Sequence, residues 1–496
     1  MNTQNRQSLI AKSLIYASIS VLIFSGNKLQ AQTSWDNNLS ASVKVELWLK
    51  ADAGVVPDNP DNVVITTWND YSGNSRQFEG HNGATYSKTS DLMNFHPSIH
   101  FSGGGTNKLT SVTSKYFVNN SSSYLVFFVS RQAAFDNAFQ SVFSFTSGQN
   151  SDFGAGDDCG WYYGQPAFRL GAADKGVAGN SYLGENTKSY GITTVLLPNV
   201  SYSNPRIYKN GENPFPYTAR RLNTGSSVAN PVHVIGSSGA GAGSSNPFNG
   251  NVQEIIIVSI PSTDSYLYSD FRKINSYLSI KYGISLDRNT ETLVYPDYYA
   301  SNGTLVWNQS DNTGYNNYVF GIGRDDGSGL YQTQSKNMDE NAYSPTVYVG
   351  DLKTLNDPSN GTLQNRQYLL LGANSASPIS SLTNVTNGTY ETGGSINISN
   401  FNIQSPVYKA QVTGASPITV KLGLPRGGNF THALVSKYAD FRESDTGLYN
   451  LTGVAPEIKL DNNTYRYIKF IGYRKDFEKT KKYIISNKNR TSKIKK

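Results

Sequence analysis

The sequence has few of the residues that build disulfides, metal clusters or highly charged surfaces. Among 496 residues there is one cysteine, Cys159, and only 16% are Asp, Glu, Lys or Arg. A single cysteine excludes an intrachain disulfide, a zinc finger and an iron–sulfur cluster, because each needs several thiolates. The low charged fraction argues against a disordered polyelectrolyte and a long coiled coil. After residue 32, no apolar run is long enough for a membrane-spanning helix.

The net charge of +7 is concentrated at the two ends of the chain. Residues 1–32 contribute three positive charges, and residues 469–496 contribute a net nine, from eleven Lys and Arg against two acidic residues. The rest of the chain therefore carries a net charge of −5. Because phosphate recognition needs a basic face, this mildly acidic body is not expected to bind nucleic acid.

The N-terminus has the pattern of a secretory signal. Arg6 and Lys12 precede an apolar stretch at 13–25, and the small residue Ala31 follows. A cationic region, a short apolar region and a small residue near the end are typical of a signal peptide. We therefore expect a signal peptide at 1–31 and a secreted or cell-surface protein.

The remaining composition predicts an all-β protein. The chain has 45 Gly and 33 Tyr, and short segments rich in Tyr, Thr, Val and Ile are bounded by Gly, Asn, Pro and Asp. Such short, regularly spaced strands indicate a sandwich or jelly-roll. The predicted strands are 43–49, 63–68, 98–101, 124–130, 140–145, 167–170, 193–197, 206–209, 232–235, 254–259, 303–308, 318–323, 346–349, 367–371, 407–413, 419–424, 432–436 and 465–471.

One segment, at about 264–282, has the spacing of a helix instead. Its apolar residues recur every three or four positions, which places them on one helical face. These residues are Leu267, Phe271, Ile274, Leu278 and Tyr282. Gly283 follows where a helix commonly ends. We expect this helix to pack on the first sandwich and to mark its end.

These features predict two β-sandwiches and a tail. The first, a jelly-roll, is expected at 35–285, and the second at 286–473. The sandwiches are predicted to meet near Asp287, and a basic tail is predicted at 474–496.

Several strings resemble those of a known family. The strings of the first region are Glu46–Gly54 (ELWLKADAG), Thr67–Asn74 (TWNDYSGN), Ile99–Gly103 (IHFSG), Asn246–Ile257 (NPFNGNVQEIII) and Asn275–Ile284 (NSYLSIKYGI). Together they resemble the laminin-G-like, concanavalin A-like domains of secreted Bacteroidota surface proteins. The strings of the second region are Gly303–Asn308 (GTLVWN), Gly321–Leu330 (GIGRDDGSGL) and Gln334–Lys336 (QSK). They resemble the domain of unknown function that commonly follows in such proteins.

This resemblance implies a concanavalin A-like jelly-roll, export, and a binding or adhesive role without an established reaction. Glycoside hydrolases also use this fold, and they need two carboxylates, often as Glu-x-Asp-x-Glu on one strand face. The chain has no such string, and Glu46 and Glu254 stand apart from other acidic residues. A non-catalytic binding or adhesion protein is therefore favoured. The alternatives are a hydrolase whose carboxylates come from separate strands, and a purely structural surface protein.

The strongest candidate for a ligand site is the glycine-rich segment 154–164. It brings two carboxylates, Asp157 and Asp158, close to the aromatic rings of Trp161 and Tyr163. Aromatic faces stack on the C–H surfaces of sugars, and carboxylates accept hydrogen bonds from hydroxyl groups. We therefore expect a polysaccharide or surface glycan as the partner. The alternative is a strand that starts at Trp161 and buries alternate aromatic rings.

Calcium is the one cofactor that the sequence leaves open. Three acidic turns, at 58–62, at 157–158 and at Asp325 and Asp326, have the oxygen-rich composition that Ca²⁺ needs. Asp and Asn are also ordinary turn residues, because their side chains bond to nearby backbone groups. Asp325 and Asp326 are therefore weak metal-site candidates.

Overall fold

The structure is a computed structural model, and it describes most of the chain between Trp35 and Gly472. Within that range the residues not described are 36, 58–60, 82, 91, 105, 113–121, 134–139, 145–157, 162–167, 172–189, 198–205, 212–232, 238–246, 261–266, 288–295, 339–343, 376–388, 392–394, 398–402, 426–428 and 442–444. The predicted signal peptide and basic tail lie outside the described residues.

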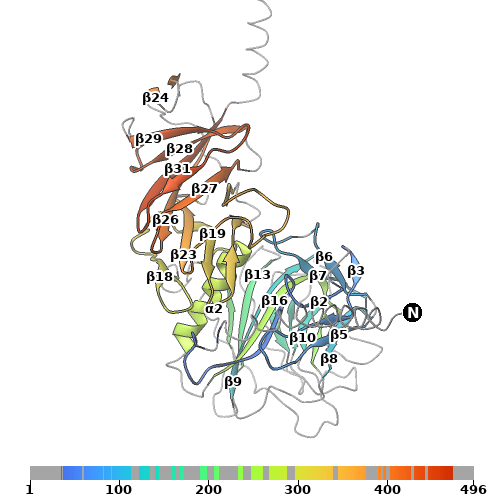
Figure 1. The fold of residues 1–496 in the computed structure, drawn as a ribbon. Coiled ribbons are helices and arrows are strands. Elements are labelled where there is room, and N and C mark those ends of the chain that lie inside the picture. The colour runs from blue at the N-terminus through green and yellow to red at the C-terminus, as the bar shows by residue number, and fades with distance from the viewer. Residues whose placement is uncertain are drawn as a thin grey trace, which may run out of the picture.

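The first sandwich consists of two eight-stranded antiparallel sheets (Figure 1). The first sheet has the order β14 (Arg206–Lys209), β13 (Tyr190–Leu197), β9 (Ser123–Gln132), β16 (Asn249–Ile260), β7 (Ser98–Ser102), β6 (Thr85–Ser87) and β3 (Val63–Val64), with β1 (Lys44–Lys50) also paired to β16. The second sheet has the order β12 (Phe168–Gly171), β11 (Asp158–Trp161), β10 (Gln140–Ser144), β15 (Val234–Ile235), β8 (Lys108–Ser111), β5 (Phe78–His81), β4 (Thr67–Trp68) and β2 (Val55–Val56).

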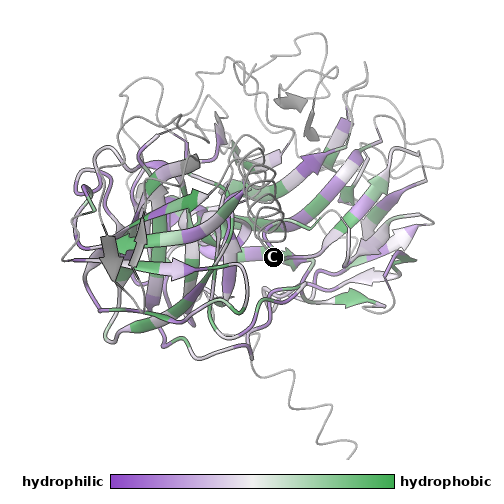
Figure 2. Cartoon of the chain, turned by 90° about the horizontal axis from the view of Figure 1, so that it is seen from above, coloured by the Kyte–Doolittle hydropathy of each residue, from purple (hydrophilic) through white to green (hydrophobic). Residues whose placement is uncertain are grey.

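The first sheet is buried on both faces, and its sequence shows why. Successive side chains of a strand point to opposite faces. In β16, Ile255 and Ile257 belong to the core between the two sheets, whereas Ile256 and Val258 belong to a second core on the other side. An unbroken apolar run is therefore required here. Elsewhere in both sandwiches, hydrophobic and hydrophilic residues alternate along many strands (Figure 2).

The second sandwich packs a seven-stranded antiparallel sheet on a four-stranded one. The larger sheet has the order β20 (Leu330–Gln332), β19 (Asn317–Asp325), β23 (Gln367–Ala373), β26 (Ile403–Thr413), β31 (Tyr465–Gly472), β28 (Phe430–Ser436) and β29 (Thr446–Asn450). The smaller sheet has the order β21 (Gln334–Lys336), β22 (Thr346–Tyr348), β27 (Ile418–Gly423) and β30 (Ile458–Leu460). Two hairpins are β17 (Tyr298–Tyr299) with β18 (Leu305–Trp307), and β24 (Thr389–Glu391) with β25 (Ser395–Asn397).

The predicted helix is confirmed as α2, Leu267–Tyr282, and it is the one helix among the described residues. Gly283 ends it with a φ of +62°, and an added Cβ there would lie 2.1 Å from the carbonyl oxygen of Lys336. A glycine is therefore needed at this position.

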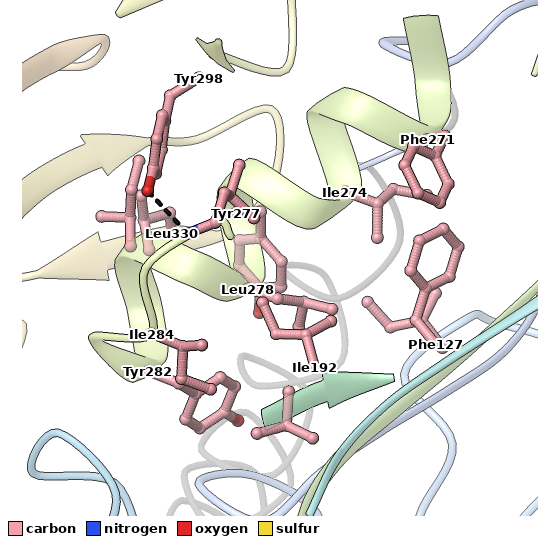
Figure 3. Close-up of a cluster of buried hydrophobic side chains, with 14 of the residues drawn as sticks. Phe127, Ile192, Phe271, Ile274, Tyr277, Leu278, Tyr282, Ile284, Tyr298 and Leu330 are labelled. Carbon is pink, nitrogen blue, oxygen red and sulfur yellow. Dashed lines mark hydrogen bonds between the residues drawn. The ribbon is translucent and has the colours of Figure 1, made fainter. Parts of the chain in front are cut away.

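The helix follows the last strand of the first sandwich and packs on that sandwich, as expected, but the second sandwich packs against it as well. On one side, the ring of Phe271 lies 6.0 Å from that of Phe127 on β9. On the other, Tyr298 and Leu330 of the second region belong to the same buried cluster (Figure 3). The dashed line in Figure 3 is the hydrogen bond from the Leu286 amide to the Tyr298 hydroxyl. The two sandwiches thus share a core across α2.

The all-β prediction of two sandwiches is confirmed, and each predicted strand overlaps a strand of the structure. The sequence did not predict several strands, most of them two to four residues long, including β2, β6, β17 and β20. Such strands are too short to establish an alternating pattern. None of the described helices is long and apolar enough to cross a membrane.

Candidate functional site

The structure describes only part of the segment predicted to bind sugar. Asp157 and Tyr163 lie outside the described residues. Asp158 and Trp161 are the ends of β11, which pairs with β10 and β12. This part of the segment is therefore a strand within the second sheet, and it ends at Trp161, where the alternative interpretation has a strand start.

The acidic turn at Asp325 and Asp326 is held by contacts within the protein. Asp325 is 1% exposed, and its carboxylate accepts hydrogen bonds from the Ser301 amide and hydroxyl, the Gly327 amide and the Tyr368 hydroxyl. Asp326 forms an ion pair with Arg324 at 2.7 Å. Hydrogen bonds within the protein thus explain the presence of Asp325, and an ion pair explains that of Asp326, without a metal ion. In the part of the chain that the structure describes, no group of three His, Cys, Asp or Glu side chains is arranged to hold a metal ion.

A buried polar network lies where α2 meets β1 and β16. The Glu254 side chain is completely buried. Its Oε1 accepts the Trp48 indole N–H at 2.6 Å and the Tyr277 hydroxyl at 2.8 Å. Its Oε2 accepts the Lys281 ammonium at 2.7 Å and the Tyr282 hydroxyl at 2.7 Å. Four donors therefore satisfy both carboxylate oxygens, as a buried charge requires.

The two tyrosines of this network remain hydrogen-bond donors. Burial and the nearby charge of Glu254 raise the pKa of both Tyr277 and Tyr282 well above 10.0. Burial alone would lower the pKa of Lys281, but the charges of Asp52 and Glu254 outweigh it and raise the pKa. The Lys281 ammonium thus balances the charge of Glu254, and both oxygens of this carboxylate already accept two hydrogen bonds each. Glu254 therefore has no free oxygen for catalysis.

A second branch of the network reaches the other sandwich. Asp52 lies 3.0 Å from the Lys281 ammonium and 3.2 Å from His96 Nδ1. His96 Nε2 lies 2.7 Å from the side-chain oxygen of Gln332 on β20. Both ring nitrogens of His96 are therefore engaged, and no nucleophile contacts this aspartate–histidine pair among the residues that the structure describes. Its geometry indicates a link between the sandwiches and not a catalytic dyad.

A tight turn supports the same link. Asn94 and Phe95 have φ angles of +49° and +69°, and the Met93 and His96 backbones bond to each other across them. The completely buried Asn94 side chain donates to the carbonyl of Lys281 at 2.9 Å and accepts the Lys336 amide at 2.8 Å. It therefore caps the end of α2 and also bonds to β21 of the second sandwich.

The second sandwich carries an aromatic surface that the sequence analysis did not single out. On the outer face of its larger sheet, Tyr465 and Tyr467 of β31 lie beside Tyr315, and we call these three residues the tyrosine face. The Tyr467 ring centroid is 5.5 Å from that of Tyr315 and 5.7 Å from that of Tyr465. Tyr465 is 48% exposed, and the other two are partly exposed. The sequence signal was the period-two pattern Tyr-x-Tyr-x-Lys at 465–469.

Two lysines accompany the tyrosine face. Lys409 on β26 is in register with Tyr467, and its ammonium lies 4.5 Å from the Tyr465 ring centroid. Lys469 on β31 is in register with two apolar residues and lies 5.7 Å from the ring centroid of Phe441. Burial lowers the pKa of both lysines. The surface therefore combines exposed rings with partly desolvated cations.

Comparison with known proteins assigns no reaction to the chain. Residues 270–465 match the model of a family described as a domain of unknown function, DUF8202. The match covers less than half of the chain and begins inside α2, so the helix is included with the second sandwich. No curated protein matches the chain.

Three solved structures illustrate the similarity found. Domain 4 of the extracellular arabinanase AbnA from Geobacillus stearothermophilus, solved with arabinotriose, is 15% identical with a TM-score of 0.31, over 46% of this chain and 97% of that one. Trypanosoma rangeli sialidase is 11% identical with a TM-score of 0.30, over 46% and 32%. The binding domain of botulinum neurotoxin serotype G is 9% identical with a TM-score of 0.32, over 86% and 92%. At these scores, no activity is transferred to the chain.

Proposed function

We propose that this chain is a non-catalytic binding protein for polysaccharide, and that the tyrosine face is one of its contact surfaces. The observation that carries the proposal is Tyr465, a residue that is 48% exposed on the outer face of the larger sheet. Tyrosine combines an apolar ring with a hydroxyl group, which suits the C–H faces and hydroxyl groups of sugars. Because such stacking is modest for each ring, affinity would come from repeated contacts along a polymer.

The contacts of three carboxylates, those of the buried Glu254 and Asp325 and of the partly exposed Asp52, support a role without catalysis. Glu254 and Asp325 accept hydrogen bonds on both oxygens, and Asp52 pairs with Lys281 and His96. A glycoside hydrolase needs one carboxylic acid and one free carboxylate beside the scissile bond. The hydrolase alternative would therefore depend on carboxylates other than these three. Incubation of the protein with the polysaccharides that it binds, followed by an assay for reducing ends, tests that alternative.

The organisation that we propose follows the sequence. A signal peptide at 1–31 directs export, a laminin-G-like, concanavalin A-like sandwich occupies 35–285, a second sandwich occupies 286–473, and the basic tail at 474–496 follows. Such a protein would act outside the cell or at its surface. N-terminal sequencing of the exported protein tests the first element, because cleavage would leave Gln32 as the first residue.

A second sugar contact is proposed on the first sandwich, at the segment containing β11. There Trp161 or Tyr163 would stack on a sugar, and Asp157 or Asp158 would accept its hydroxyl groups or hold calcium. The Trp161→Ala variant should lose glycan binding with little change in thermal stability. Binding assays with and without EDTA test whether calcium takes part.

The tyrosine face is tested with one variant and two matched controls. In affinity electrophoresis through a panel of soluble polysaccharides, Tyr465→Ala should bind more weakly by roughly fivefold or more, because it removes a stacking ring. Tyr465→Phe keeps the ring and should bind nearly as well as the native protein. Leu352→Ala removes a side chain that is also 48% exposed and should bind as the native protein does. Binding to no polysaccharide would favour the purely structural alternative.

A further inference from the structure

Among the residues that the structure describes, the only carboxylate whose charge acts on the two lysines beside the tyrosine face is that of Asp311, which acts on Lys409 from beyond ion-pair distance. Among the described residues, neither Lys409 nor Lys469 forms an ion pair. Lys409 is 8% exposed, and its ammonium donates to the carbonyl of Asp311 at 2.9 Å. Desolvating a cation costs free energy unless an anion or several acceptors compensate it. The protein thus holds two cations in positions that an external anion would stabilise.

The side chains around Lys469 show most clearly that its cation lies in apolar surroundings. Its neighbours in register on the two flanking strands are Val407 and Leu434, which belong to one apolar cluster with Phe441. A lysine among apolar side chains costs stability that a leucine or methionine would not cost. Lys469 is partly exposed, and its ammonium has the Phe441 ring at 5.7 Å as a compensating contact, so an external anion would stabilise it further.

The two lysines and the tyrosines form one continuous surface. Tyr465, Tyr467 and Lys469 alternate along β31 and so lie on the same face. Lys409 faces Tyr467 across the strand pair, which makes it a diagonal neighbour of Lys469, about 7–8 Å away between backbones. A chain that stacks on the rings therefore passes both ammonium groups.

We propose that the tyrosine face and these two lysines bind an acidic polysaccharide, whose sugar rings stack on the tyrosines and whose carboxylates pair with Lys409 and Lys469. This inference rests on the proposed function and names its ligand class. The charge complementarity favours a uronate-containing chain over a neutral one, because a neutral sugar would leave Lys469 without a counter-charge and Lys409 with only the more distant Asp311 carboxylate. The exposed tyrosine rings beside the cations favour a sugar over an acidic peptide, because sugar rings stack on them.

The test compares a charged polymer with its neutral methyl ester. Polygalacturonate and its fully methyl-esterified form share a sugar backbone, and binding is measured at 0.15 M salt, where the screening length is about 8 Å. The native protein should bind polygalacturonate at least roughly fivefold more tightly than the esterified polymer. Equal or tighter binding of the esterified polymer would overturn the inference but leave the proposed function intact. If the protein binds neither of these polymers and no other polysaccharide, both the inference and the proposed function are wrong.

Variants separate this site from the basic tail, which every variant keeps. Lys469→Met preserves the length and apolar contacts of the side chain and removes its charge, so it should weaken polygalacturonate binding roughly tenfold. Lys469→Arg should restore most of the affinity. Lys459→Met removes an exposed charge from β30 on the other sheet and should have little effect. Similar losses for Lys459→Met and Lys469→Met would show general attraction and overturn the proposal.

A last comparison distinguishes an acidic polysaccharide from an acidic polypeptide. Polyglutamate supplies carboxylates without sugar rings, so it should bind more weakly than polygalacturonate and should be insensitive to Tyr465→Ala. If polyglutamate binds as tightly as polygalacturonate, the surface recognises acidic peptides and the polysaccharide assignment is wrong.

Discussion

The Lys281 ammonium of α2 lies 2.7 Å from the carboxylate of Glu254 on β16, and the Glu254 side chain is completely buried. This pair forms where the helix contacts the first sandwich. Asp52 extends it, at 3.0 Å from the same ammonium. Ion pairs of this kind add little net stability compared with apolar residues, but removing one partner leaves an uncompensated buried charge. The junction therefore depends on Lys281.

The first prediction follows from that asymmetry. Lys281→Met should lower the free energy of unfolding by about 3–5 kcal/mol, because Glu254 remains buried with only neutral donors. Urea unfolding followed by circular dichroism measures this. The control is Lys421→Met, which breaks a surface pair 3.7 Å long with Asp351 and should cost less than about 1 kcal/mol. Equal effects for the two variants would contradict the prediction.

The second prediction concerns acid stability. Burial lowers the pKa of His233 from 6.5 to about 3. Below pH 6.5 the unfolded chain therefore binds a proton at His233, whereas the folded protein binds it only below about pH 3. The free energy of unfolding falls as the pH drops through this window. The loss from this residue is about 1.4 kcal/mol for each pH unit.

Replacing the imidazole tests this directly. His233 stacks on Phe143 with 5.9 Å between ring centroids, so His233→Phe keeps an aromatic ring there. Between pH 6.5 and 5, where few carboxylates titrate, the variant should lose stability less steeply than the native protein. His81→Phe, at an exposed position, is the control and should leave the slope unchanged. An unchanged slope for His233→Phe would show that another group causes the acid sensitivity.

The sequence predicted the elements of the fold well because their signals are local. The helix followed from the three- and four-residue spacing of its apolar positions, and β16 and β9 followed from short segments rich in β-branched and aromatic residues between turn residues. The junction was not predicted, because its residues are far apart in the chain. Asp52 and Lys281, for example, are separated by 229 positions. A charged residue inside an apolar segment, as at Glu254 and Lys281, does indicate a buried partner but does not identify it.

The candidate site was harder to predict for a similar reason. Alternation in β31 shows that Tyr465, Tyr467 and Lys469 share a face, but it does not show which face is open. That depends on tertiary contacts. The buried Trp307 lies against Gly372 of β23, whereas Tyr465 of β31 stays exposed. The sequence instead favoured the segment 154–164, whose composition resembles a sugar site and of which the structure describes only β11.

The third prediction concerns Asn94, which bonds both to the end of α2 and to β21. Asn94→Ala removes these bonds and places a side chain without polar atoms at a φ of +49°. Asn94→Gly removes the same bonds but tolerates that φ. Both variants should therefore be destabilised, and alanine should be worse than glycine by about 1 kcal/mol. Thermal unfolding of the two variants gives the comparison, and alanine equal to or better than glycine would show that the turn relaxes.

The last prediction is that the two sandwiches unfold together, because α2 contributes to a core that both of them share. Leu278 is 1% exposed in a cluster that contains Ile256 of β16 and Leu370 of β23. Leu278→Ala leaves a cavity in that shared core and should lower the free energy of unfolding by about 2–5 kcal/mol. Because this core contains residues of β9 and of β23, amide protection should fall in both strands alike.

Hydrogen exchange followed by mass spectrometry distinguishes this from independent unfolding. The comparison variant is Leu460→Ala, which makes a cavity of similar size in the core between the two sheets of the second sandwich. If the sandwiches are coupled through α2, this variant should also reduce protection in β9, which lies in the other sandwich. Loss of protection confined to β23 and its neighbours would show that each sandwich unfolds independently. In that case, the helix joins the two sandwiches without coupling their stabilities.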